Sequence, residues 1–252
     1  MKQYRIGVEL YTLRNELQQD FKGVCRDLAK LGIDLVEPAF RYGGMEPAEI
    51  AAFFKELKWN VLSVYALNWE EIADADSTAA QYASAFNAPY ITIGQNGDFS
   101  TQWQELADAL VPAVNANATH GRKTIYHNHS HEFVRTAEGD CAYDKFIDAA
   151  FAAPALELEP DIGWIARAGY DPVEFIKRYG QHIPIIHLRD NSKSGSTFAA
   201  LGEGVLDLPS CIAALEDTPC DTLIYEQDSY ETTAWESTVA SIEYLKKLLN
   251  RG

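Results

Sequence analysis

The chain has 252 residues, 47% of them hydrophobic, which is enough to bury one sizeable core. Its formal net charge of −16 at pH 7 repels phosphate backbones and anionic lipids, so nucleic acid and membranes are not expected as partners. The four cysteines show no CxxC spacing, which indicates reduced thiols rather than a disulfide framework. The N-terminal stretch MKQYRIGVELYTLR lacks an apolar region of signal-peptide type, so a cytoplasmic location is expected.

Short apolar runs alternate with amphipathic segments along the chain. The strand-like runs are Arg5–Tyr11, Ile33–Pro38, Asn60–Leu67, Tyr90–Gly94, Lys123–Asn128, Ala155–Pro160, Pro184–Leu188 and Thr222–Glu226. The helical patterns between and after them are Asp20–Leu31, Glu46–Lys58, Thr78–Phe86, Gln102–Ala118, Tyr143–Phe151, Asp171–Tyr179, Leu208–Glu216 and Ala234–Leu249.

This alternation predicts parallel strands joined by right-handed crossovers. Eight such units in one chain predict a single (β/α)8 TIM barrel, an α/β fold over residues 1–252 as one domain. An open doubly wound sheet is the alternative, but it usually carries a glycine-rich turn after its first strand. The stretch Glu9-Leu10-Tyr11-Thr12 contains no glycine.

Polar residues collect at the predicted C-terminal ends of the strands, where barrel enzymes place their chemistry. Strand alternation can put one ligand-type side chain at the same height on four neighbouring strands: His127, Asp161, His187 and Glu226. Two imidazoles and two carboxylates suit a divalent ion such as Mn²⁺, Zn²⁺, Co²⁺ or Fe²⁺.

Each of these residues also has a simpler interpretation. Asp161 can be the N-cap of the segment IGWIARAG, Glu226 an ordinary loop carboxylate, and either histidine a structural group. Their joint occurrence on four consecutive strands favours the shared metal site.

Several stretches together resemble the xylose isomerase-like TIM barrels, the group of sugar phosphate isomerases and epimerases, which also includes inosose dehydratases and abasic-site endonucleases. The stretches that carry the resemblance are GVELYTLR, GIDLVEP, YHNHSHEF, DIGWIARAGYDP, IIHLRD, LGEGVLDLP and IYEQD. The resemblance implies a divalent metal at the barrel mouth, held by Asp161, His187 and Glu226 and, on the fifth strand, by His127. Many epimerases of the group carry glutamate at the position of His127.

His127 makes an epimerase in particular less expected. Epimerisation needs a base on each face of the substrate, and a metal-bound imidazole has no free lone pair. One base, Glu226, suffices for an aldose–ketose isomerisation through an enediolate, and it also suffices for β-elimination next to a ketone. The resemblance therefore implies a metal-dependent isomerase or epimerase-type enzyme acting on a sugar or keto-polyol. The alternative is a dehydratase or lyase acting on an inosose or 3-keto-sugar.

Further residues are expected to serve the same site. Glu226, Glu159 and Arg189 are the candidates for catalysis, although Arg189 can instead form a salt bridge with Asp190. Candidates for substrate binding are Glu9, Glu37, Trp69, His129, Trp164, Arg189 and Glu203. For Tyr11, plain packing is favoured over contact with a sugar.

Two other functions remain as alternatives. An abasic-site endonuclease shares this barrel, but it needs more metal ligands and a basic groove, which a net charge of −16 does not favour. A non-catalytic barrel that binds a sugar or metal is the minor alternative. The chain has no dedicated phosphate loop, which slightly favours an unphosphorylated small-molecule substrate. A homodimer is possible, but the sequence does not decide the oligomeric state.

Overall fold

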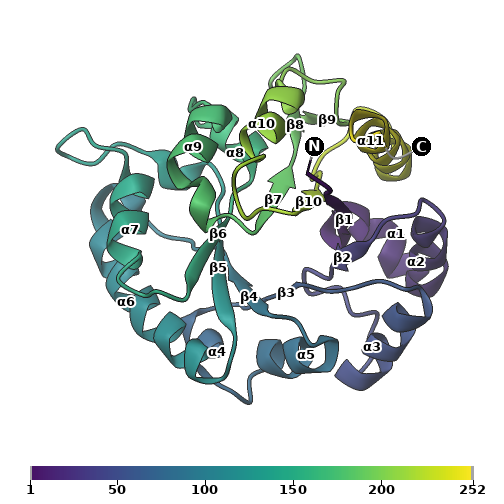
Figure 1. Ribbon diagram of the computed structural model, residues 1–252, viewed down its shortest axis with the longest axis horizontal. Coiled ribbons are helices and arrows are strands. Elements are labelled where there is room, and N and C mark those ends of the chain that lie inside the picture. Colours follow the sequence, from purple (N-terminus) through teal and green to yellow (C-terminus); the bar gives the residue numbers. More distant parts are fainter. Residues whose placement is uncertain (1, 251–252) are drawn as a thin grey trace.

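The structure is a computed structural model that describes residues 2–250, and a ring of parallel strands surrounded by helices dominates it (Figure 1). The strands of the ring are β1 (Arg5–Glu9), β2 (Leu35–Glu37), β3 (Ser63–Tyr65), β4 (Tyr90–Ile93), β5 (Lys123–His127), β6 (Leu156–Glu159), β7 (Ile185–Leu188) and β10 (Thr222–Tyr225). Each lies within the range that the sequence predicts.

Two four-stranded parallel sheets make up the ring, in the orders β2-β1-β10-β7 and β3-β4-β5-β6. Isolated parallel bridges join them at both seams, Leu35 to Asn60 and Asp161 to His187. At the second seam the backbone N–H of His187 donates a hydrogen bond to the carbonyl oxygen of Pro160, with N and O 2.9 Å apart. The predicted TIM barrel is therefore confirmed.

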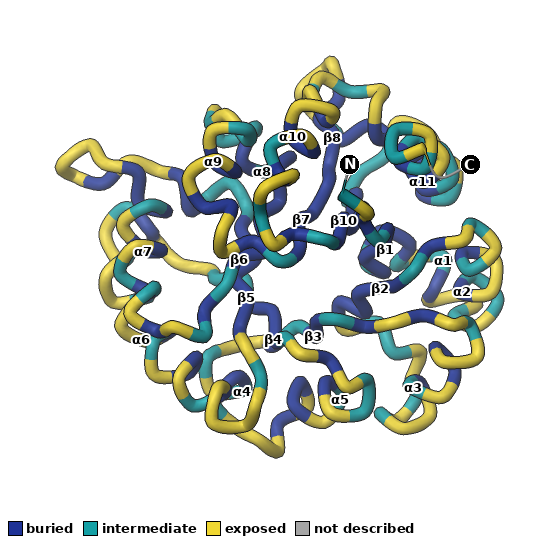
Figure 2. The backbone as a smooth tube through the Cα atoms, in the orientation of Figure 1, coloured by how far each residue is buried: buried dark blue, intermediate teal, exposed yellow. Residues whose placement is uncertain are grey.

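The longer helices also agree with the sequence. They are α2 (Phe21–Ala29), α3 (Pro47–Glu56), α5 (Thr78–Phe86), α6 (Phe99–Thr119), α7 (Ala142–Ala150), α9 (Pro172–Tyr179), α10 (Leu208–Ala214) and α11 (Ala234–Leu248). Figure 2 shows mostly buried residues in the ring and a mixture of exposed and buried residues on the outer helices. Within residues 2–250, no helix combines the length and apolarity needed to cross a membrane.

Short elements lie between these. They are the helices α1 (Arg14–Gln19), α4 (Trp69–Ala73) and α8 (Ile162–Arg167), the 3-10 turns η1 (Leu10–Leu13), η2 (His131–Phe133) and η3 (Gly180–His182), and the antiparallel pair of β8 (Asp190–Asn191) and β9 (Phe198–Ala199). Of these short elements, the sequence indicated only α8, through Asp161 as a candidate N-cap. The turn η1 directly follows β1 and continues into α1, while α8 and β8 begin within three residues of the ends of β6 and β7, so these elements help to shape the barrel mouth.

The barrel interior is layered. A small apolar cluster of Leu35, Ile125, Ile185 and Ile224 is separate from the main core between barrel and helices. Gly7 leaves room for this cluster, because a Cβ atom there would lie 2.5 Å from the side chain of Ile224. Two residues after each cluster member, and therefore on the same face of its strand, comes a polar one: Glu37, His127, His187 and Glu226. An apolar plug thus supports a polar layer at the C-terminal ends of the strands.

Candidate active site at the barrel mouth

The four residues predicted to bind a metal come together in this polar layer. His127 ends β5, Asp161 follows β6, His187 lies in β7 and Glu226 directly follows β10. One potential ligand atom from each lies within 4.8 Å of those from the other three, and all four residues are buried. Neighbouring parallel strands with matched register produce this convergence, since Ile224 of β10 pairs with His187 of β7.

His187 lies at the centre of the polar layer. Its Nδ1 is 2.9 Å from Oε2 of Glu226, and its Nε2 is 2.7 Å from Oε2 of Glu37. Burial by itself lowers the pKa of His187, but the carboxylates of Glu159 and Glu37 and the hydrogen bonds of Glu226 and Glu37 raise it well above its usual range. The Ser63 hydroxyl donates to Oε1 of Glu37, 2.5 Å away, so Glu37 is fixed as a partner that orients the imidazole.

His127 has the opposite character. Burial, followed by the nearby charge of His187, holds its pKa well below the usual value, so the imidazole is neutral at pH 7. The two imidazole centroids are 4.7 Å apart. Its Nδ1 is buried and has no hydrogen-bond partner among residues 2–250, although Oε2 of Glu159 lies 3.4 Å away. A neutral imidazole with a free nitrogen is the form that binds a metal ion.

Arg189 is fully buried beside this cluster. Its Nε donates to Oδ2 of Asp161 at 2.7 Å, and its Nη2 lies 2.5 Å from Oε1 of Glu226. Its Nη1 lies 2.7 Å from Oδ2 of Asp228. The alternative prediction, a salt bridge with Asp190, is therefore wrong. The Asp190 carboxylate instead accepts hydrogen bonds from the backbone of the loop over residues 202–206.

Asp161 combines two of its predicted interpretations. Its Oδ1 caps α8 by accepting the N–H groups of Gly163 at 2.9 Å and Trp164 at 3.1 Å. Its Oδ2 accepts from Arg189. The cap orients the carboxylate toward the cluster, and Oδ2, which accepts one hydrogen bond, keeps a further lone-pair direction.

The pKa values of the Glu9 and Glu226 carboxyl groups are shifted in opposite directions although both groups border the same cavity. Burial and the charge of Glu226 raise the pKa of Glu9 well above its usual value. Burial also raises the pKa of Glu226, but Arg189 and His187 outweigh it and hold that pKa well below the usual value. The surroundings therefore favour the ionised form of Glu226 and the protonated form of Glu9.

A cavity of about 390 Å³ opens above the polar layer. Of the predicted site residues, Glu9, His127, His129 and Glu226 line it. The sequence did not single out several other lining residues, among them Tyr65, Arg41, Gln95, Asn96 and Asp228. Tyr11, for which packing was favoured, lines it too. Of the lining residues that were not singled out, Asp228 could have been found from the sequence, because it follows Glu226 by two residues and so lies on the same face of the strand.

The remaining predicted residues lie elsewhere. Glu37, Glu159, Asp161, His187 and Arg189 are buried beneath or beside the cavity and do not line it. The ring of Trp164 lies 5.7 Å from that of His129 and 5.0 Å from that of Phe198, as measured between centroids. Trp69 begins α4 and Glu203 is exposed in a turn, and neither lines the cavity.

The donor set fits a divalent cation. Glu9, Glu37, Glu159, Asp161, Glu226 and Asp228 gather around two groups with raised pKa values, His187 and Arg189. A dication would offset part of this excess of carboxyl groups and give the free nitrogen of His127 a partner. His127, Asp161, His187 and Glu226 are the residues that could hold it.

Comparison with known proteins agrees with this architecture. The family described as "Xylose isomerase-like TIM barrel" matches residues 25–248. An inosose dehydratase of Geobacillus kaustophilus (strain HTA426) is 35% identical over 91 residues, which are 36% of this chain and 28% of that protein. The chain thus matches little more than a quarter of this relative's length.

Solved structures extend the likeness across the fold. A sugar phosphate isomerase/epimerase from Parabacteroides distasonis superposes with a TM-score of 0.82 at 16% identity, covering 98% of this chain and 94% of that one. The IolI protein with a bound zinc atom superposes with a TM-score of 0.74 at 15% identity, covering 98% of each chain. With the family match spanning most of the sequence, the chain belongs to the xylose isomerase-like TIM barrels.

Proposed function

We propose that this protein is a divalent-metal-dependent enzyme that removes a proton next to the carbonyl group of a sugar or keto-polyol, giving an enediolate. The observation that carries the proposal is geometric. The four candidate metal ligands converge within 4.8 Å of one another beside a cavity lined by two carboxyl groups, Glu226 and Glu9, whose pKa values are shifted down and up respectively. Two such groups with separated protonation states are the arrangement that acid–base catalysis requires.

Glu226 is the proposed base. It is ionised at neutral pH, borders the cavity, and is held in place by His187 and Arg189. Glu9 is proposed to donate its proton to a substrate oxygen, and the Tyr65 hydroxyl, which donates to Oε2 of Glu9 at 3.2 Å, fixes its orientation.

A divalent ion bound by His127, Asp161, His187 and Glu226 would polarise the substrate carbonyl and thereby lower the pKa of the C–H group on the neighbouring carbon. The chain itself supplies the base and the acid, and Arg189 holds the base in its ionised form through its contact with Glu226. Glu159, predicted as catalytic, is sealed under the cavity with its Oε2 3.3 Å from the Tyr65 hydroxyl, so a positioning role suits it better.

The first product consistent with this arrangement is an aldose–ketose isomer. Glu226 would return the proton to the adjacent carbon on the same face, while Glu9 would move a proton between the two oxygens. Epimerisation is less well supported, because Glu159, the other carboxylate near His127, does not line the cavity.

Dehydration is the second candidate, and the name of the Geobacillus relative favours it. In that case Glu226 would remove the proton and Glu9 would protonate the departing hydroxyl group. Both reactions share the first step and differ in the fate of the neighbouring carbon–oxygen bond.

The first step can be tested by exchange. We expect the metal-loaded enzyme to incorporate deuterium next to the carbonyl of a responsive substrate, when a panel of keto-sugars and inososes in D₂O is followed by NMR. Glu226→Gln should slow exchange at least about 100-fold, because the base is lost. The matched surface change Glu243→Gln should leave the rate unchanged.

Exchange at an unaltered rate in Glu226→Gln would contradict the assigned base. The same spectra separate the products, since an isomer keeps all its atoms whereas dehydration removes water. Ligand binding without exchange or product across the panel would support the non-catalytic alternative.

A further inference from the structure

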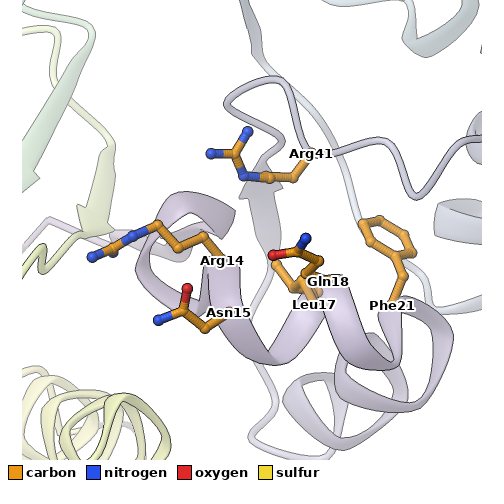
Figure 3. Close-up of a pocket in the computed structure, with 6 residues that line it drawn as sticks. All are labelled: Arg14, Asn15, Leu17, Gln18, Phe21 and Arg41. Carbon is orange, nitrogen blue, oxygen red and sulfur yellow. The ribbon is translucent and has the colours of Figure 1, made fainter.

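A second hollow of about 390 Å³ adjoins the barrel-mouth cavity. Figure 3 shows the six residues that line it, Arg14, Asn15, Leu17, Gln18, Phe21 and Arg41. Arg41 lines both hollows, so the two are neighbours. In the close-up the guanidinium ends of Arg14 and Arg41 point to the same side, away from Phe21.

Tyr11 connects the two arginines with the site. Its ring lines the barrel-mouth cavity, and it has the guanidinium carbon of Arg14 4.5 Å from its centroid and that of Arg41 5.1 Å away. Arg14 is further anchored by backbone oxygens. Its Nη1 donates to the carbonyl of Tyr11 at 3.2 Å and its Nη2 to that of Asp228 at 2.8 Å.

These partners hold the guanidinium groups without neutralising them. Over residues 2–250, neither Arg14 nor Arg41 forms an ion pair with a carboxylate, and both are partly exposed to solvent. Some other arginines do find acidic partners, as in the pairs Arg5–Asp221 and Arg178–Asp144. Arg26, Arg122, Arg135 and Arg167 also lack a carboxylate partner among residues 2–250. Arg14 and Arg41 differ from these four because both line a hollow beside the barrel-mouth cavity.

We propose that Arg14 and Arg41 form a subsite for an oxyanion, a phosphate or a carboxylate, at the end of the substrate remote from the reacting carbonyl. This inference rests on the proposed function, because it places the reacting end of the same molecule beside Glu226. Planar guanidinium groups suit oxyanions through paired N–H donors, and the Tyr11 ring keeps both cations in place.

The subsite can be tested by binding alone. We expect inorganic phosphate, titrated into the metal-loaded protein by calorimetry, to bind at least about tenfold more weakly to Arg14→Gln and to Arg41→Gln than to the unchanged protein. Arg26→Gln is the matched control, since Arg26 is exposed and stacks on the Phe53 ring at 5.6 Å but lines neither hollow. Equal phosphate affinity in all four proteins would overturn the proposal.

A kinetic comparison then identifies the source of the oxyanion. Substrate pairs that differ only in a terminal phosphate, carboxylate or hydroxyl group are compared by KM. The preferred anionic substrate should show at least about a tenfold higher KM in Arg41→Gln with little change in kcat, and its neutral counterpart should show no change. A preference for the neutral substrate in the unchanged protein would contradict the subsite.

The two proposals fail in different ways. Weaker phosphate binding in the arginine variants without deuterium exchange on any substrate would leave the subsite standing and contradict the function. Deuterium exchange that depends on Glu226, together with phosphate binding that is unchanged in both arginine variants, would support the function and contradict the subsite.

Discussion

At the scale of single residues, the barrel mouth depends on carboxyl groups whose protonation is set by burial and by neighbours. The candidate ligands His127, Asp161, His187 and Glu226 could be predicted from sequence, because each is a ligand-type residue at a strand end. Tyr65 and Arg41 could not be predicted, since neither residue type at those positions signals chemistry. Only the folded chain shows that they line the cavity.

Glu132 gives a pH-dependent prediction at this scale. It is fully buried, both its oxygens accept the backbone N–H of His129, and burial raises its pKa from 4.5 to about 7. Because the folded state holds this proton more tightly than the unfolded state, its contribution to stability is complete below pH 4.5 and is lost as pH rises through 7.

We therefore expect Glu132→Gln to gain stability relative to the unchanged protein as pH rises from about 5 to about 8, by up to about 3 kcal/mol. The glutamine oxygen can still accept from His129 but carries no charge to bury. Urea unfolding at several pH values measures the difference, and the exposed change Glu138→Gln serves as control. If the free energy of unfolding changes with pH in the same way in the Glu132→Gln variant and in the unchanged protein, the Glu132 carboxyl group does not contribute to the pH dependence of stability.

At the scale of elements, the barrel strands were predictable because each pairs an apolar run with a polar end. The helices α1 and α4 were missed because they have only six and five residues, too few for a clear amphipathic repeat. The six-residue helix α8 was indicated only by its candidate cap, Asp161. The start of α6 was placed at Gln102 rather than Phe99. Its cap, Asp98, accepts from the N–H of Ser100, and this contact lies before the periodic part of the helix.

One side chain makes several of the hydrogen bonds that hold the loop that follows β9. Asp190 is buried, and its carboxylate accepts the backbone N–H groups of Gly202, Gly204 and Leu206, each at 3.0 Å. The loop fits closely around it, since a Cβ atom on Gly204 would lie 2.2 Å from Oδ1 of Asp190.

Asp190→Ala should therefore lower the free energy of unfolding by about 3 kcal/mol, because it leaves three N–H groups without their charged acceptor. Limited proteolysis should also cut the segment over residues 200–206 faster. The exposed change Asp217→Ala is the control and should have little effect. Unchanged stability and unchanged cleavage would mean that other contacts hold this loop.

At the scale of the whole molecule, the chain combines an acidic surface with a barrel that concentrates carboxyl groups in its interior. The apolar plug of Leu35, Ile125, Ile185 and Ile224 supports these groups at one height, and the closed ring gives each a neighbour on both sides. The sequence could predict this ring from its eight repeated units. The charge balance inside it could not be predicted, because it depends on which of these buried groups Arg189 contacts.

The proposed function depends on one divalent ion held by residues at the ends of four strands. Crystals soaked with Mn²⁺ and measured for anomalous scattering test this directly. We expect one strong peak about 2.0–2.3 Å from a ligand atom of each of His127, Asp161, His187 and Glu226. A peak bound by a different set, such as Glu9 and Glu37 with His187, or crystals without any bound Mn²⁺, would contradict it.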